Sequence, residues 1–213
     1  PTGTALDDIT ADYIAALNSP DVALCGQEIQ IFNAQGRRVW RDPSWAALVC
    51  AAMTAGTSSP GTPITTKRPN ILDFRADWGS SAEDVEAMIA ASVLGFSRTE
   101  LGAAQVARGV TTYQATTNEA LQELSARESS LESLRRLHAG LSAQIGDKIV
   151  AGKTQLIKGQ AEALLQDQVD AGVIAAFRNV QVQQVGSLIR ISYELAPAFP
   201  LNFLLITANL VRQ

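Results

Sequence analysis

The chain has 213 residues, of which 46% are hydrophobic, and its formal net charge is -4. This length and apolar content fit one or two globular domains with a sizeable core. Only 18% of the residues are charged, below the roughly 25% of an average soluble domain, which suits a protein surrounded by copies of itself. The acidic balance argues against nucleic-acid binding, because proteins that bind nucleic acids usually present a basic face.

Targeting signals and cysteine usage exclude further classes. The first ten residues are polar and acidic, so we expect no secretory signal. No apolar stretch reaches the roughly 18 residues of a membrane span, so we expect no membrane insertion. The sequence lacks an initiator methionine, which suggests a fragment or a processed chain. Cys25 and Cys50 have apolar neighbours and are predicted to be buried free thiols, since two cysteines do not form a disulfide scaffold.

The N-terminal half is predicted to contain short helices and strands. In chain order, we expect a helix over 6–17, a strand over 28–33, a helix over 45–55, a helix over 82–93 and a strand over 106–112. The second helix has Asp42 as its expected N-cap and Pro43 at its first position, and Gly56 ends it. Ser80 and Glu83 form a capping-box pattern at the start of the third helix.

The segment over 57–70 interrupts these elements. It holds three prolines and a Ser-Ser-Pro-Gly run, which are typical of irregular structure. We therefore predict an exposed loop that is mobile or carries contacts.

The C-terminal half begins with the longest regular pattern. Leucines recur at three- and four-residue steps over 117–145 and predict one long helix. A second helix is expected over 153–171, closed by Gly172. The period then changes to two, beginning with Val180 and Val182, and 188–195 alternates as a strand. This segregation of helices and strands favours an α+β fold, with a mixed sheet flanked by several helices including one long helix, and a C-terminal strand.

The closing segment, 196–213, is the predicted C-terminal strand or arm. Its last thirteen residues are apolar on both faces, and a terminus this hydrophobic is expected to be buried in its own sheet or in a neighbour's. Both possibilities stay open from the sequence. As candidate subunit-interface residues we take Leu201, Phe203, Leu204, Leu205, Ile206, Thr207, Ala208, Leu210 and Val211.

Catalytic and metal-binding patterns are weak. His138 is the only histidine and has no acidic residue four positions before or after it. No Gly-x-Ser-x-Gly elbow marks a nucleophile, and one histidine with two distant cysteines does not complete a zinc site. The segment over 151–154 ends like a phosphate-binding loop but lacks the upstream glycine. We therefore predict no catalytic residue, no metal site and no cofactor.

Several segments in order resemble tail sheath proteins of contractile phage tails and related injection machines. Pro-Ser-Trp-Ala-Ala at 43–47 leads into Ala-Ala-Met-Thr-Ala-Gly at 51–56, and Arg-Gly-Val-Thr-Thr at 108–112 precedes the long helix. The C-terminal end, with Leu-Ala-Pro-Ala-Phe-Pro-Leu at 195–201 followed by an expected terminal strand, is also similar to the end of these sheath proteins. The ordered likeness covers the chain from about residue 20 onward, whereas the family's longer N-terminal arm is not matched.

The resemblance implies a single sheath-core domain over 1–213 whose role is structural. Sheath subunits form sixfold rings that stack helically around a tail tube protein, join neighbours by adding strands to one another's sheets, and contract to drive injection. It also implies a virion component assembled in the host cytoplasm.

Two other functions remain as alternatives from the sequence. A small α+β hydrolase or transferase would need a site assembled in the fold, and it predicts a deep pocket with a perturbed histidine or cysteine. A tail adaptor or tube component of another fold predicts a dominant β-barrel or sandwich.

Overall fold

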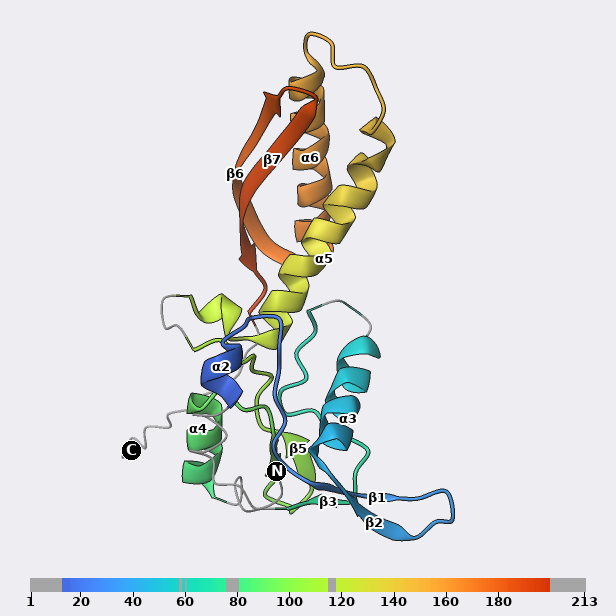
Figure 1. Ribbon diagram of the computed structural model, residues 1–213, viewed down its shortest axis with the longest axis vertical. Helices are drawn as coiled ribbons and strands as arrows, with labels where there is room; N and C mark the ends of the chain where they lie inside the picture. Colours follow the sequence, from blue (N-terminus) through green and yellow to red (C-terminus); the bar gives the residue numbers. More distant parts are fainter. Residues whose placement is uncertain (1–12, 58, 60, 76–80, 115–117, 200–213) are drawn as a thin grey trace, which may run out of the picture.

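The chain is elongated and consists of two lobes along its long axis (Figure 1). This computed structural model describes residues 13–57, 59, 61–75, 81–114 and 118–199. We call the described residues up to 123 the lower lobe, and residues 124–199 the upper lobe, after their places in Figure 1.

The lower lobe contains short helices and two small sheets. Its elements are α2 (Ala15–Leu17), β1 (Ile29–Phe32), β2 (Arg38–Arg41), α3 (Pro43–Ala55), β3 (Asp73–Phe74), α4 (Ala82–Ala90), β4 (Phe96–Arg98), β5 (Ala104–Val106) and the 3₁₀ turn η2 (Glu119–Leu121). One sheet has the antiparallel order β2-β1-β3, and the other pairs β4 with β5. The β1–β2 hairpin projects from the side of the lobe (Figure 1).

The upper lobe is two long helices packed beside a long hairpin. Its elements are α5 (Leu124–Leu141), the 3₁₀ turn η3 (Ser142–Gln144), α6 (Lys153–Asp170), β6 (Ile174–Val185) and β7 (Leu188–Pro197). β6 and β7 form a two-stranded antiparallel sheet, and α6 packs mainly against β6. The α+β class is therefore confirmed, although the described strands form three separate antiparallel sheets instead of one mixed sheet.

Each lobe has a core of its own. The lower core gathers side chains from the sheets, α3 and the chain between them, with Phe74 and Phe96 at its centre at a ring separation of 6.1 Å. The upper core is built where α5, α6 and the hairpin meet, and its buried members are Leu137, Ala161, Leu165, Val173, Ile174 and Val180. Burial of these apolar surfaces is the main favourable term in folding.

A row of small residues lets α5 approach the hairpin. Ser125, Ser129 and Ser133 recur every four residues, so they share one helix face, and all three are buried. The Ser129 hydroxyl donates to the carbonyl of Val173, and the Ser133 hydroxyl lies 3.3 Å from the hydroxyl of Tyr193. This face of α5 is therefore joined to the hairpin by hydrogen bonds as well as by apolar packing.

The N-terminal caps of α3 and α4 can be compared residue by residue with those predicted from the sequence. α3 begins as predicted, because Asp42 accepts hydrogen bonds from the Ser44 backbone and Pro43 occupies the first position. The predicted capping box of α4 is wrong by one residue. Ser81 accepts from the Asp84 backbone, and the Asp84 carboxylate accepts from the Ser81 backbone. Both Ser80–Glu83 and Ser81–Asp84 satisfy the same spacing rule, so the sequence pattern did not distinguish them.

Three predicted segments differ from the structure. The long helix begins at Leu124 and not near 117, because the 3₁₀ turn η2 ends at Leu121 and a β-bridge to Val110 holds Glu123 extended. The strand expected over 106–112 is confined to β5 and that bridge. The loop over 57–70 is exposed only in part, since Ile64 is 3% exposed and belongs to the lower core. Ile64 fits there because the loop crosses over the core instead of leaving it.

Candidate assembly surfaces

The residues predicted to form the subunit interface are not among those that the structure describes. The predicted helix over 6–17 is described only from residue 13, and the C-terminal segment only as far as residue 199. The interface residues that lie outside the described chain are Leu201, Phe203, Leu204, Leu205, Ile206, Thr207, Ala208, Leu210 and Val211. The surfaces that can be analysed are therefore those of the two lobes.

The β6–β7 hairpin presents two open strand edges. β6 has 12 residues and β7 has 10, and among the described residues each pairs only with the other. An open edge carries a row of backbone N–H and C=O groups that a further strand can pair with. Figure 1 shows the hairpin running along the side of the upper lobe, away from the body of the lower lobe.

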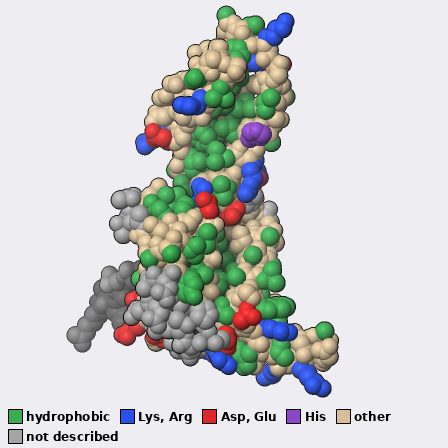
Figure 2. All heavy atoms as spheres, in the orientation of Figure 1, with side chains coloured by type: hydrophobic (Ala, Val, Ile, Leu, Met, Phe, Trp, Pro, Cys, Tyr) green, Lys and Arg blue, Asp and Glu red, His purple; other side chains and the backbone are tan. Residues whose placement is uncertain are grey.

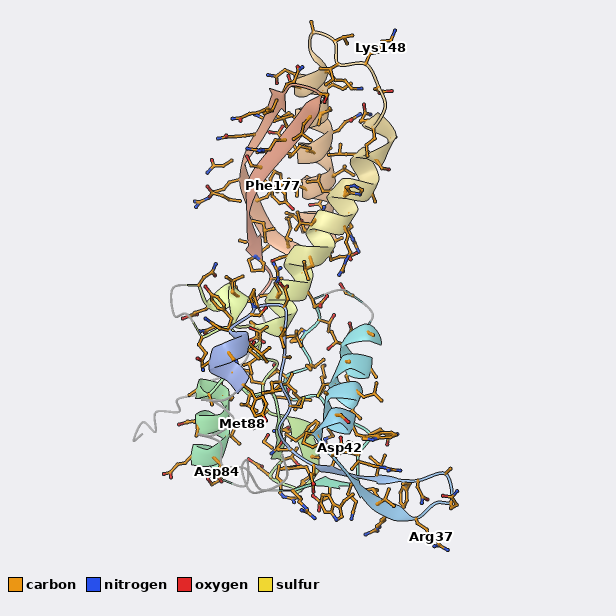
Figure 3. All side chains as sticks on the ribbon, in the orientation of Figure 1. Arg37, Asp42, Asp84, Met88, Lys148 and Phe177 are labelled. Atoms are coloured by element: carbon orange, nitrogen blue, oxygen red, sulfur yellow. The ribbon has the colours of Figure 1, made fainter. Side chains whose placement is uncertain are left out.

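Two irregularities in β6 decide which of its side chains reach the core. The pairing register shifts between Ile174 and Ala176 and again between Arg178 and Gln181. Asn179, at the second shift, has a φ of 56°. Such bulges reverse the alternation of side chains, and they bring Phe177 and Val180 to the same core although three positions separate them. Figure 3 shows Phe177 at mid-strand.

An apolar groove lies beside this hairpin in the upper lobe. It encloses about 570 Å³ between α5, the chain before α6, and the β6–β7 turn. We call it the α5–β7 groove, and its lining includes Leu134, His138, Leu141, Ile145, Leu188 and Tyr193. Leu134 is 50% exposed, Ile145 75% and Leu188 56%. Figure 2 shows hydrophobic side chains gathered next to the histidine on this part of the surface.

The β1–β2 hairpin of the lower lobe combines aromatic and basic side chains. Phe32 pairs with Arg38 and Gln30 with Trp40, so these four side chains share one face. Phe32 is 55% exposed and Trp40 40%, and the guanidinium of Arg75 lies 5.3 Å from the Trp40 ring. Figure 3 places Arg37 at the hairpin tip. Aromatic and arginine side chains of this kind are enriched in protein interfaces.

A second groove lies between α3 and the start of α5. It encloses about 590 Å³, and its lining includes Cys25, Cys50, Thr54, Leu94 and Glu132. Cys50 is buried and Cys25 half-buried, and both are free thiols. The hydrogen bond to Cys50 and burial raise the pKa of the Cys25 thiol well above its ordinary value, so near neutral pH it is a thiol and a poor nucleophile.

His138 and the two cysteines are not brought together. His138 is exposed in the α5–β7 groove, whereas the two cysteines line the other groove, and the two grooves share no residue. In the part of the chain that the structure describes, no three His, Cys, Asp or Glu side chains are grouped so as to hold a metal ion. The Lys153 ammonium lies 2.7 Å from Asp147 and so belongs to an ion pair. No described helix is long and apolar enough to cross a bilayer.

The sequence reading gave no weight to the two hairpin surfaces and the α5–β7 groove. A signal existed for the β6–β7 hairpin, since Gly186 and Ser187 form a short turn between two β-rich stretches. Nothing in the sequence pattern indicated the groove, because leucines that line it follow the same helical period as leucines in the core.

Comparison with known proteins gives one relative in sequence. The tail sheath protein of Bacillus phage SP01 is 23% identical over 168 residues, covering 78% of this chain and 29% of the relative. No protein-family model matches the chain.

Solved structures match over a larger share of the chain. A chain of the anti-feeding prophage baseplate matches with a TM-score of 0.72 and 11% identity, over 92% of this chain and 56% of that one. The contracted PVC sheath of an extracellular contractile injection system matches with a TM-score of 0.67 and 11% identity, over 98% of this chain and 61% of that one. The sheath tail protein from Desulfitobacterium hafniense matches with a TM-score of 0.66 and 14% identity, over 88% of this chain and 48% of that one.

The sequence relative is a tail sheath protein, and the matched structures are of a prophage baseplate, a contracted sheath and a sheath tail protein. The chain spans about half the length of the matched structures and less than a third of the curated relative. The chain therefore resembles contractile tail sheath proteins in sequence, and its fold is one that their subunits contain.

Proposed function

We propose that this chain is the core region of a structural subunit of a contractile tail sheath, which polymerises around a tail tube and contracts to drive injection. The observation that carries the proposal is the fold, since both lobes together match sheath structures over 88% and 98% of the chain. The sequence relative is likewise a tail sheath protein. An enzymatic function has no comparable support, because His138 and the thiols lie in separate grooves.

The surfaces of the upper lobe suit this role physically. Open edges on β6 and β7 allow a neighbouring copy to add a strand, and main-chain hydrogen bonds then supply affinity. The α5–β7 groove offers apolar surface next to the same hairpin, and apolar burial strengthens association. The apolar segment over 201–211 is the part of the sequence that we propose to pair as such a strand, within the chain or with a neighbour.

The partners follow from this proposal. They are other copies of the chain, in sixfold rings and helical stacks, and a tail tube protein. The protein is then a component of the virion tail, assembled in the host cytoplasm, and it needs no cofactor. Head-to-tail contacts between identical copies generate rings when the rotation closes and helical filaments when it does not, so both kinds of contact suit one subunit.

Electron microscopy of the complete encoded protein, including any sequence that flanks these residues, tests the proposal. We expect tubes or stacked rings in negative stain over salt concentrations from about 0.05 M to about 1 M. Monomers alone under all these conditions would refute it.

Substitutions in the α5–β7 groove sharpen the test. Leu134 and Leu188 are about half exposed, so the double variant Leu134→Glu, Leu188→Glu is expected to fold. It places two buried charges in the proposed contact and should reduce tube formation at least tenfold. The matched control is Leu101→Glu in the lower lobe, where Leu101 is 90% exposed, and it should assemble normally. Equal assembly by both variants would remove this groove from the interface.

A further inference from the structure

Two cysteines from separate elements face each other inside the lower lobe. Cys25 lies in an extended segment that pairs with Leu94 in a parallel β-bridge, and Cys50 lies in α3 at 4% exposure. The two side chains are hydrogen-bonded and pack in the same apolar cluster. They also line the same groove. Two thiols that already touch need little backbone movement to be joined.

We propose that Cys25 and Cys50 form a reversible disulfide site, which a small disulfide such as oxidised glutathione closes. The Cys25 thiol loses its proton to water, and its sulfur attacks one sulfur of the oxidant, so that one glutathione leaves as a thiolate. Cys50 then loses its proton and attacks the Cys25 sulfur of the mixed disulfide, expelling the second glutathione. One oxidised glutathione is reduced to two thiols, and the protein loses two hydrogens.

The structure indicates this order of attack. Cys25 is half-buried, whereas Cys50 is buried, so an oxidant entering the groove of about 590 Å³ reaches Cys25 first. The second step is intramolecular and needs no solvent access to Cys50. Attack by Cys25 is slow near neutral pH, since its pKa is raised by the hydrogen bond to Cys50 and by burial and the thiolate is the reactive form. At equilibrium the reducing glutathione pool of the cytosol keeps the pair open, and oxidising surroundings close it.

The cross-link would join parts of the lower lobe that are far apart in sequence. The chain before Cys25 also receives a backbone hydrogen bond of 2.7 Å from Thr112 to the Val22 carbonyl. A disulfide would therefore tie α3 directly to the extended segment of Cys25, which this hydrogen bond links to the segment that leads toward α5. Closing this loop restricts the unfolded chain and should raise the thermal midpoint by roughly 5 °C.

The test treats the folded, reduced protein with oxidised glutathione and maps its peptides by mass spectrometry without reduction. We expect one cross-linked peptide pair containing Cys25 and Cys50, loss of both free thiols, and a higher thermal midpoint that reverts on reduction. A lasting glutathione adduct on Cys25 alone, dimers linked between chains, or two unreacted thiols would each overturn the proposal.

Single variants separate the role of Cys25, which attacks the oxidant, from that of Cys50, which closes the disulfide. Cys50→Ala should accumulate the mixed disulfide on Cys25, whereas Cys25→Ser should leave Cys50 unreacted, since Cys50 is buried. If Cys50→Ala fails to fold, the wild-type peptide map and midpoint shift still decide the question. Rapid modification of Cys50 in folded Cys25→Ser would contradict the proposed order of attack.

Discussion

At the scale of single residues, the ion pair between Arg108 and Glu123 anchors the start of α5. The Arg108 Nε lies 3.0 Å from the Glu123 carboxylate, and the glutamate side chain is only 2% exposed. Arg108→Ala leaves a buried carboxylate without this partner, and we expect a loss of about 3 kcal/mol in the free energy of unfolding. Urea unfolding followed by circular dichroism measures it.

The control for this prediction is another arginine. Arg135 pairs with Glu132 at 3.5 Å, but its side chain is 63% exposed. Arg135→Ala should therefore cost less than about 1 kcal/mol. Similar losses in the two variants would mean that burial of Glu123 is not what makes the first pair important.

Gly61 is a second residue whose identity the structure requires. Its φ is +76°, and an added Cβ would lie 2.9 Å from the Ser129 Cβ and 3.1 Å from the Ser125 carbonyl oxygen. Gly61→Ala therefore combines backbone strain with a steric clash against α5, and we expect a cost of about 3 kcal/mol in unfolding free energy.

Gly36 provides the matched control for Gly61. Its φ is +71°, but nothing lies within 4 Å of an added Cβ. Gly36→Ala should cost only about 1 kcal/mol, the strain of a left-handed backbone. The difference between the two variants, measured by the same unfolding curves, isolates the contact between the 57–70 loop and α5.

At the scale of elements, the bulge in β6 carries a pH-sensitive contact. Hydrogen bonds from Asn179 and then Arg178 lower the pKa of the Glu194 carboxyl below its ordinary value of 4.5. A lowered folded-state pKa contributes stability above the unfolded pKa, and that stability is lost as the pH falls through the folded value. The thermal midpoint should therefore fall on acidification from about pH 5 to about pH 3, and Glu194→Gln should weaken this dependence. An unchanged profile in the variant would assign the acid sensitivity to other carboxylates.

Elements with a regular sequence pattern are the ones that the sequence predicts well. α6 and α3 were predicted nearly to the residue, because α6 has a helical apolar period, α3 has a clear start at Asp42 and Pro43, and each has an end signal in Gly172 or Gly56. β7 alternates cleanly and was also predicted. β6 was recognised only in part, since its bulges break the period of two on which the prediction depends.

The remaining misses have a common physical cause. The start of α5 is set by a bridge between Val110 and Glu123, and the burial of Ile64 by a core assembled from distant segments. Both depend on contacts far apart in sequence, which local propensity does not encode. The candidate surfaces belong to this group too, because a groove is formed by elements and not by any one of them. The interface predicted over 201–211 stays a prediction.

At the scale of the whole molecule, the loop at the far end of the upper lobe is a probe of assembly. Lys148 lies in this loop (Figure 3) and is exposed, and its neighbours Asp147 and Ile149 line the α5–β7 groove. We expect trypsin to cleave unassembled protein rapidly after Lys148 and to cleave tubes at least tenfold more slowly there. Mass spectrometry of the first fragments measures this. Equal rates at Lys148 in both states would place this end outside the contacts.

The helix that joins the lobes also has a mechanical consequence. α5 has 18 residues, which corresponds to a rod of about 27 Å. Its base is fixed to the lower lobe by the hydrogen bond from Leu124 to the Gly109 carbonyl at 2.9 Å, and its far end carries Leu141 at the α5–β7 groove. A rod pivoting at its base acts as a lever, so a tilt of about 10° moves the far end by about 5 Å. A small adjustment at one end of the subunit would thereby be amplified into a displacement comparable with the spacing between neighbouring strands.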